Sequence, residues 1–448
     1  MAVNPRDNTT AYAHPQETNL LNVHKAMDYN PAGQPVLRID DTSLQHTSKD
    51  RAKISGYEIV FFNTFQYDKE VDVWDELTTT GGSAVHSDVR SEVVLTVDGA
   101  VAGSKVVRQT KTVQRYIPGR TAEASFAFRF TDTEAGIRRR IGMFDDQNGL
   151  FLEEIGDELA FVIRSNASGS VVDTRITQAN WNQNKLDGTA ANGITLDPTM
   201  RQIVIFECEW YGAGMAEMKF VIDDHPISVH KQFHGNRQQL PWMGTPFVPF
   251  RCEIENVSAT TGTHNLHQSS NSFMLEGATG LLGVAVSVSS PITGTRLVVA
   301  NNWYPVLSIR LQPDKLAGVV IPSTYQVATI DNTNLFFRLV RNAVIGADAG
   351  NSAWTDVPDS GSSSFTQYQT YDTPAAIDDA DQGTLLDSGF IVAGGGSANI
   401  TLDQRTQYQL GRNTTTTIGD TSDVFTLLCA SSSTNKDALA SMTWIEQR

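Results

Sequence analysis

Two carboxylates in the middle of the chain have a spacing that glycoside hydrolysis could use. Glu207 and Glu209 lie two residues apart in the segment IVIFECEWYG. In an extended strand their side chains share one face, with Cα atoms about 6.5–7 Å apart. Retaining glycosidases need two carboxyl groups roughly 5–5.5 Å apart. The position where a further acid would be expected holds Gly212. We therefore interpret the pair as a solvent-facing carboxylate row and predict no catalytic residue.

A second candidate site is the segment FDDQNG, in which Asp145, Asp146 and Asn148 precede Gly149. Carboxylate and amide oxygens in one tight loop are ligands that Ca²⁺ takes. However, Asn-Gly between two strands is also the strongest short signal for a β-hairpin. A hairpin needs no metal, so we favour the hairpin. The three residues stay as calcium candidates, and no cofactor is expected.

Three histidines lie close together, at His225, His230 and His234, with Asp223 beside them. Their spacings do not bring three zinc ligands to one face of a strand, and the sequence has no H-E-x-x-H helix. We therefore expect no metal here. Instead, we interpret the histidines as polar residues of the sandwich or as interface histidines. A further hypothesis is that His230 and His234 titrate at an assembly contact near neutral pH.

The segment QQLPWMGTPFVPF places Trp242 among proline, methionine and phenylalanine in a loop-like setting. An aromatic ring in a loop can stack on a sugar or on a partner protein, and it can equally pack beneath the loop. We favour packing. Trp242, His230 and His234 are nevertheless carried forward as candidate glycan or partner contacts.

The elements that would position these residues are short strands. In IVIFECEWYG, Val204, Phe206, Cys208 and Trp210 alternate with residues of the opposite face, and a period of two is typical of a pleated strand. The same alternation recurs in SEVVLTVDG, SFAFRFTD, LAFVIRS, MKFVIDD, PVLSIRLQP, NLFFRLVRN and DVFTLLCAS. Many short strands between turn residues predict an all-β fold of antiparallel sandwiches. Parallel strands would need crossover helices, for which the sequence has almost no room.

Charge and composition argue against several classes of partner. The formal net charge is −16 at pH 7, whereas binding to nucleic acid needs many Lys and Arg on one surface. The one basic cluster, Arg138 to Arg140, is interpreted as a solvated turn. No stretch approaches the roughly 18 apolar residues of a membrane span, so neither nucleic acid nor membrane insertion is expected. Cys208, Cys252 and Cys429 lie in strand-like runs and are predicted to be buried thiols.

The length of 448 residues exceeds what one hydrophobic core usually supports. Residues 1–50 have the fewest strand signals and four scattered prolines, which predicts an extended N-terminal arm for assembly contacts. A flexible terminus without such contacts is the alternative that the sequence leaves open. Residues 51–258 are predicted to form a first jelly-roll β-sandwich. Residues 259–272, ATTGTHNLHQSSNS, have the composition of a linker, and residues 273–448 are predicted to form a second β-sandwich.

A series of strings occurs in order from Tyr57 onward. The first part holds KVVRQTKTVQRYIPGRT, IGMFDDQNGLFLEEIGDELAFVIRS, DTRITQANWNQNKLDG, GITLDPT, FVIDDHPISVHKQFHGN and FRCEIEN, and the second holds VLSIRLQP, AGVVIPSTYQV, DVFTLLCAS and SMTWIEQ. In this order they resemble a widespread family of virion structural proteins from tailed bacteriophages. The resemblance implies a virion component whose first domain is a lectin-like, concanavalin-type jelly roll. Residues 1–50 do not share it.

The resemblance and the composition together predict a structural component of a tailed-phage virion, and not an enzyme. We expect it to assemble in multiple copies through its arm and sheet edges, as a tail, tail-fibre or capsid-surface protein. Its partners would be other virion proteins and copies of itself, in a virion assembled in the host cytoplasm. The alternative is a carbohydrate-binding host-adsorption protein of the tail. A virion-borne glycosidase using Glu207 and Glu209 is less favoured, because lectin-like glycosidases carry E-x-D-x-x-E on the active strand.

Overall fold

The computed structural model describes residues 27–29, 35–37, 56–277, 282–346, 352–357, 364–394, 396–402 and 408–447. The chain divides into two compact units, Met1–Gly56 and Tyr57–Arg448. In the first unit, the described residues form two short antiparallel strands, β1 (Met27–Tyr29) and β2 (Pro35–Leu37). The rest of the predicted arm at 1–50 lies outside the described residues.

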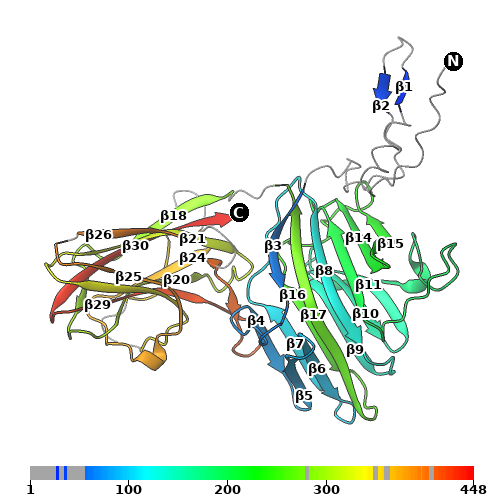
Figure 1. Cartoon of the computed structure of the whole chain (residues 1–448), viewed down its shortest axis with the longest axis horizontal. Helices are drawn as coiled ribbons and strands as arrows, with labels where there is room; N and C mark the ends of the chain where they lie inside the picture. Colours follow the sequence, from blue (N-terminus) through cyan, green and yellow to red (C-terminus); the bar gives the residue numbers. More distant parts are fainter. Residues whose placement is uncertain are drawn as a thin grey trace, which may run out of the picture. The chain divides into compact units, whose positions relative to one another are not determined.

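The N-terminal part of the second unit consists of two antiparallel sheets (Figure 1). The seven-stranded sheet has the order β12 (Val172–Thr177), β11 (Glu158–Ser165), β10 (Gly149–Ile155), β9 (Ile137–Phe144), β16 (Phe250–Asn256), β7 (Lys105–Thr110) and β4 (Trp74–Thr78). The eight-stranded sheet has the order β15 (His225–Phe233), β14 (Met215–Ile222), β13 (Gln202–Cys208), β8 (Ala122–Phe130), β17 (Thr263–Glu276), β6 (Glu92–Asp98) and β5 (Gly82–Ser87), with β3 (Tyr57–Asn63) also paired to β17.

These two sheets share one hydrophobic core between their inner faces. Strand β8 shows why: its burial alternates strictly along the segment AEASFAFRF, so that its three phenylalanines all face the core. The ring of Phe126 on β8 lies 6.0 Å from that of Phe206 on β13 and 4.5 Å from that of Phe250 on β16. Because Phe250 belongs to the seven-stranded sheet, these aromatic contacts join the two layers.

The C-terminal part of the second unit has its own core and two further antiparallel sheets. The five-stranded sheet contains β18 (Val284–Ser289), β30 (Lys436–Gln447), β21 (Val319–Thr329) and β26 (Ser397–Thr401), with β19 (Thr295–Leu297) paired to β30. The six-stranded sheet has the order β23 (Thr355–Asp356), β24 (Thr366–Thr370), β20 (Tyr304–Leu311), β29 (Val424–Ser431), β22 (Leu335–Arg341) and β25 (Thr384–Ile391). A small pair, β27 (Arg412–Asn413) and β28 (Thr421–Ser422), completes the sheets.

The predicted all-β fold of antiparallel sandwiches is confirmed. Helical structure in the described residues is limited to two short 3₁₀ helices, η1 (Gln178–Asn180) and η2 (Asp379–Asp381). Within the same residues, no helix has the length and apolar character needed to cross a membrane.

The predicted linker at 259–272 is wrong for most of its length. Strand β17 begins at Thr263 and pairs with β3, β6 and β8, so this segment is central to the eight-stranded sheet. The segment has the polar composition of a loop. Its polar side chains can nevertheless lie within a sheet because strands far away in the sequence supply their hydrogen-bonding partners. Asn265 accepts a hydrogen bond from Thr96 at 2.7 Å, and the ring of His267 lies 2.8 Å from Glu92.

Candidate functional site

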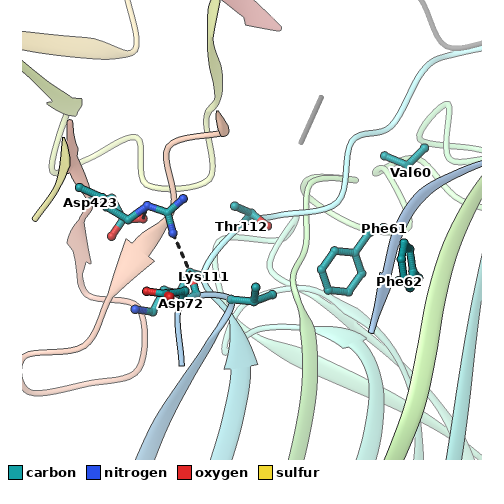
Figure 2. Close-up of a pocket in the computed structure, with 9 residues that line it drawn as sticks. Val60, Phe61, Phe62, Asp72, Lys111, Thr112 and Asp423 are labelled. Atoms are coloured by element: carbon teal, nitrogen blue, oxygen red, sulfur yellow. Dashed lines mark hydrogen bonds and ion pairs between the residues drawn. The ribbon is translucent and has the colours of Figure 1, made fainter. Parts of the chain in front are cut away.

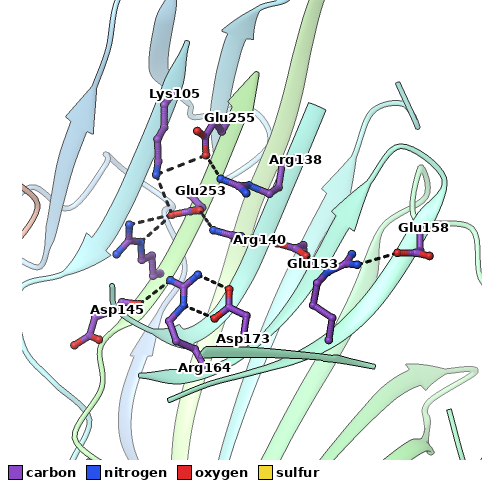
Figure 3. Close-up of polar contacts among 12 residues, drawn as sticks. Lys105, Arg138, Arg140, Asp145, Glu153, Glu158, Arg164, Asp173, Glu253 and Glu255 are labelled. Atoms are coloured by element: carbon purple, nitrogen blue, oxygen red, sulfur yellow. Dashed lines mark hydrogen bonds and ion pairs between the residues drawn. The ribbon is translucent and has the colours of Figure 1, made fainter. Parts of the chain in front are cut away.

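The outer face of the seven-stranded sheet carries a dense network of ion pairs (Figure 3). Three neighbouring strands supply most of it, and on β9 and β16 the charged residues of this face occupy alternate positions. Strand β9 supplies Arg138 and Arg140, β10 supplies Glu153, and β16 supplies Glu253 with Arg251 and Glu255. The register places Arg140 directly opposite Glu153 on one side and Glu253 on the other. Cross-strand pairs of opposite charge are thus built into the strand pairing.

At the centre of the network one arginine links two carboxylates. The Nε of Arg140 donates to Glu153 at 2.6 Å, and its Nη1 donates to Glu253 at 2.8 Å. Glu253 is bound a second time by Arg251, whose Nη2 lies 2.9 Å away, while Arg175 donates to Glu153 at 2.6 Å. Glu153 and Glu253 are each 1% exposed. Both carboxylates are therefore held by two guanidinium groups and are shielded from water.

Two phenylalanine rings lie within the same network. Phe144 and Phe151 are fully buried and have ring centroids 4.4 Å apart. The guanidinium carbons of Arg140 and Arg164 lie 5.4 and 5.2 Å from the Phe151 centroid, and that of Arg251 lies 5.3 Å from the Phe144 centroid. Arginines packed over aromatic faces at this range gain cation–π attraction in addition to their ion pairs.

At the β11–β12 edge of this face, Arg164 binds Asp173 in a bidentate pair. Its Nε and Nη2 each lie 2.8 Å from one carboxylate oxygen. Figure 3 shows this pair, with both dashed contacts joining the guanidinium to the same carboxylate. Burial acts to raise the pKa of Asp173, but the hydrogen bond and charge of Arg164 lower it below the ordinary value.

The balance between burial and neighbouring positive charge also determines whether Glu253 can act as an acid. Burial acts to raise the pKa of Glu253, but the charges of Arg251, Lys105 and Arg140 lower it well below the ordinary value. A carboxyl group held this strongly as an anion has no proton to donate as a general acid. The face is therefore built to lock neighbouring strands together.

The basic triplet was wrongly interpreted as a solvated turn. Arg138, Arg139 and Arg140 lie in the middle of β9, and Arg139 is completely buried on the core side. The charge run is stable there because each guanidinium has a carboxylate partner on an adjacent element: Glu255 for Arg138, Glu154 for Arg139 and Glu153 for Arg140.

The carboxylate pair considered for catalysis is not solvent-facing. Glu207 is completely buried and Glu209 is 2% exposed. The Nζ of Lys219 on β14 lies 2.6 Å from Glu207 and 3.6 Å from Glu217. Glu207 therefore lies in a cross-strand ion-pair row, with Glu217 directly opposite it in the register.

The calcium candidates are used by the protein itself. Asp145 accepts hydrogen bonds from the backbone N–H groups of Gln147 and Asn148, and Asp146 is paired with Arg251 at 2.7 Å. The side-chain oxygen of Asn148 accepts from the N–H of Gly244 at 2.7 Å. The predicted hairpin is confirmed by the β9–β10 register. Across the described residues, no group of three or more His, Cys, Asp or Glu side chains is placed to hold a metal ion.

The three candidate glycan or partner contacts lie inside the fold. Trp242 is 4% exposed, its indole N–H donates to the Trp210 carbonyl at 3.1 Å, and its ring stacks on His234 with centroids 4.8 Å apart. His234 and His230 are also buried. Burial lowers the pKa of both imidazoles below the ordinary value. This setting favours neutral, packed rings over titration at a contact near neutral pH.

Sequence reasoning missed the charged face as a unit. A usable signal was present, since Arg138 and Arg140 alternate on one segment while Glu253 and Glu255 alternate on another. Alternating charges of opposite sign on two strands are what cross-strand pairing requires.

Comparisons with known proteins give only distant similarities. No protein-family model matches the chain, and no curated protein matches it. Among solved structures, an endo-β-1,4-glucuronan lyase from the fungus Trichoderma reesei is 12% identical, with a TM-score of 0.31, covering 49% of this chain and 96% of its own. A glycosyl hydrolase family protein from Mycobacterium fortuitum is 11% identical, with a TM-score of 0.33, covering 48% and 99%. The CBM2 module of the evolved Dit from Lactobacillus casei BL23 phage J-1 is 7% identical, with a TM-score of 0.33, covering 51% and 99%.

These matches correct one expectation. The prediction that the chain is not an enzyme is contradicted, because the similar structures include a lyase and a glycosyl hydrolase. At such low identity and TM-score they assign no reaction and no catalytic residue to this chain.

Proposed function

We propose that this chain is a structural component of a tailed-phage virion, present in several copies, and that it assembles through an exposed sheet edge. The ordered strings from Tyr57 onward support the virion role, since they resemble tailed-phage structural proteins. The observation that carries the assembly role is an apolar strip along β25, the last strand of the six-stranded sheet.

The β25 strip consists of Leu385 and Phe390 on β25, Val392 directly after its end, and Phe336 on the neighbouring β22. Phe336 on β22 lies directly opposite Phe390 on β25, so both side chains project from the same face of the sheet. Phe390 is 68% exposed and Phe336 is 40% exposed, and the other two side chains are also exposed. Of the described strands, β22 is the one that pairs with β25.

An exposed edge strand with a row of large apolar side chains favours association with another chain. Its free backbone groups can pair with a further strand, and natural proteins usually protect such edges with charges, prolines or a covering segment. Contiguous apolar surface rimmed by polar residues is typical of an interaction site. In a particle built from repeated subunits, a neighbouring subunit would cover the strip, and repetition would let individually weak contacts suffice.

The test is the incorporation of a charged variant. Phe390→Asp places a carboxylate in the strip at a position that is already solvent-exposed, so the fold should survive. Val89→Asp is the matched control, because Val89 is 90% exposed in the connection between β5 and β6 of the first sandwich and is not part of the strip. We expect purified particles to contain Val89→Asp at the wild-type level and much less Phe390→Asp, measured by quantitative immunoblot. Equal incorporation of both variants, with unchanged melting temperatures, would refute the strip as the assembly edge.

The alternative function is host adsorption through glycans bound by loops of the lectin-like domain, and the candidate contacts named for it are not at the surface. Trp242, His230 and His234 are packed inside the fold, so they offer no surface for a sugar.

A further inference from the structure

Two buried asparagines lie side by side where strand β17 changes its neighbour in the eight-stranded sheet. Residues 263–268 of β17 pair with β6, whereas residues 271–276 pair with β3, and a β-bulge separates the two stretches. Asn271 on β17 lies directly opposite Asn63, the last residue of β3. Residues paired in this way have Cβ atoms about 4.5–5.5 Å apart on one face of the sheet. The two side-chain amides are therefore neighbours.

Gln268 joins the two asparagines from the other side of the bulge. On the neighbouring strand β8, Phe128 lies opposite Gln268 and Phe126 lies opposite Asn271. Because Phe126 and Phe128 are two residues apart and both belong to the core, the two amides occupy successive positions on the core side of β17. Gln268, Asn271 and Asn63 are each at most 5% exposed. These three residues are called the amide cluster below.

The amide cluster is separate from the pocket of about 220 Å³ that is lined by strands of both sandwiches (Figure 2). Three earlier residues of β3 line that pocket, but Asn63 is not among its lining residues. Two carboxylates and two basic side chains line it as well, and the Nε of Arg341 lies 3.9 Å from Asp423. The formal charges of the pocket are therefore balanced, whereas the amide cluster presents polar atoms that the described protein atoms leave unbonded.

Five side-chain atoms of the amide cluster are buried and have no hydrogen-bond partner among the described residues. They are the Oδ1 of Asn63 and both amide atoms of Gln268 and of Asn271. The sixth amide atom of the cluster, the Nδ2 of Asn63, donates to Glu70. Burying an amide without a hydrogen bond costs free energy, and the large majority of buried polar side-chain atoms in folded proteins have a partner. Five such atoms on adjacent side chains therefore point to a bound ligand.

We infer that the amide cluster binds ordered water, and that a water molecule bridges β3 and β17 there. The five atoms comprise three acceptor oxygens and two donor nitrogens. A metal cation would bind only the oxygens, and an anion would bind only the nitrogens. A water molecule both donates and accepts hydrogen bonds, and buried waters typically make about three of them to otherwise unsatisfied polar groups. Water is thus the ligand that matches both kinds of atom.

The bridging water contributes to the attachment of β3. Among the described strands, β17 is the one that pairs with β3, and the amide cluster lies at the end of that pairing. A water that bridges two polar groups is enthalpically nearly as good as a direct hydrogen bond. The inference concerns the isolated chain, so it does not depend on the virion role.

The direct test is a crystal structure of the full chain at a resolution that shows ordered water. We expect electron density about 2.7–3.2 Å from an amide oxygen and from an amide nitrogen of the cluster. Density about 2.0–2.6 Å from amide oxygens alone would identify a metal cation and overturn the inference. Direct hydrogen bonds among the three amides, with no density between them, would also overturn it.

Two nearly isosteric substitutions test the same inference in solution. Gln268→Met and Asn271→Leu replace the amides by apolar groups of similar volume. If water satisfies the amides, each substitution deprives that water of partners and should lower the melting temperature by about 2 °C or more. If the amides are simply unbonded, apolar groups of the same shape should raise the melting temperature instead, and that result would overturn the inference.

A shared water also predicts that the two substitutions are coupled. The double variant Gln268→Met, Asn271→Leu should lose less than the sum of the two single shifts in melting temperature, because the second substitution affects a water that is already weakened. Asn256→Leu is the matched control: Asn256 is fully buried, and its Nδ2 donates directly to the carbonyls of residues 98, 99 and 101. Its shift should add to that of Gln268→Met. Strict additivity for the Gln268 and Asn271 pair as well would show that they share no water.

Discussion

Arg139 and Glu154 form an ion pair inside the first sandwich, with the Nη1 of Arg139 2.6 Å from the Oε2 of Glu154 and both side chains completely buried. They are directly opposite each other on β9 and β10. Burial raises the pKa of Glu154 to about 7, although the charge of Arg139 acts to lower it. The other carboxylate oxygen, Oε1, has no hydrogen-bond partner among the described residues, which is consistent with an incompletely compensated charge.

This pair predicts a pH-dependent stability. Because the folded-state pKa of Glu154 lies above its unfolded value of 4.5, its protonation stabilises the folded state. That contribution is fully present below pH 4.5 and is lost as the pH rises through about 7. Each pKa unit corresponds to about 1.4 kcal/mol. Glu154→Gln should therefore reduce the loss of unfolding free energy over this pH range, as measured by urea denaturation at several pH values. A pH profile identical to that of the wild type would contradict the assignment.

The ion-pair face predicts a large difference between two similar substitutions. Glu253→Gln removes a buried carboxylate and leaves Arg140 and Arg251 short of a partner, so unfolding free energy should fall by about 3–5 kcal/mol. Glu158→Gln also removes a carboxylate that pairs with an arginine, Arg175, but its side chain is 51% exposed. We expect that control to change stability by less than about 1 kcal/mol. The measurement is urea denaturation. Similar losses of unfolding free energy for the two variants would show that burial does not determine how much these ion pairs contribute to stability.

The low pKa of Glu253 adds a pH effect of opposite sign to that of Glu154. A carboxylate whose folded-state pKa is lowered stabilises the fold above its unfolded pKa, and the stabilisation is lost as the pH falls toward the folded-state value. Wild type should therefore lose more unfolding free energy than Glu253→Gln during acid titration below about pH 4. The measurement is the denaturation midpoint at successive acid pH values, and parallel curves for the two proteins would contradict it.

The three cysteines are predicted to be unreactive in the folded protein. Cys208, Cys252 and Cys429 are buried and unpaired by disulfides. Burial raises the pKa of Cys208 to about 12 and shifts those of Cys252 and Cys429 in the same direction, so the reactive thiolate is scarce. A maleimide reagent should label no cysteine in buffer and all three in denaturant, as counted by mass spectrometry. Rapid labelling of any of them in buffer would show that its strand opens.

Trp242 should act as a packing residue. Trp242→Ala should lower unfolding free energy by about 3–5 kcal/mol, because it removes a buried ring that stacks on His234. Trp354→Ala is a suitable control, since Trp354 is only half-buried and contacts Arg310 at 4.2 Å from the ring centroid. If Trp242→Ala keeps wild-type stability, the loop is not packed as described.

The fold class could be predicted from the sequence, but the positions of the buried polar and charged residues could not. Alternation in IVIFECEWYG correctly predicted a strand, which the structure places at Gln202–Cys208. The same alternation placed Glu207 on a face that was expected to be solvated. In the structure Glu207 is buried and paired with Lys219. Likewise β17 was taken for a linker because His267 and Asn265 are satisfied by strands more than a hundred residues away. Periodicity reports which residues share a face, whereas the partner that makes a buried charge tolerable is set by the tertiary pairing.

The most direct test of the proposed role is immunogold electron microscopy of purified tailed-phage particles, using an antibody against this chain. The proposal predicts gold on intact particles assembled with the wild-type chain and strongly reduced gold on particles assembled with Phe390→Asp. Particles that carry no gold, and whose disrupted contents also lack the chain on an immunoblot, would contradict a structural role in the virion.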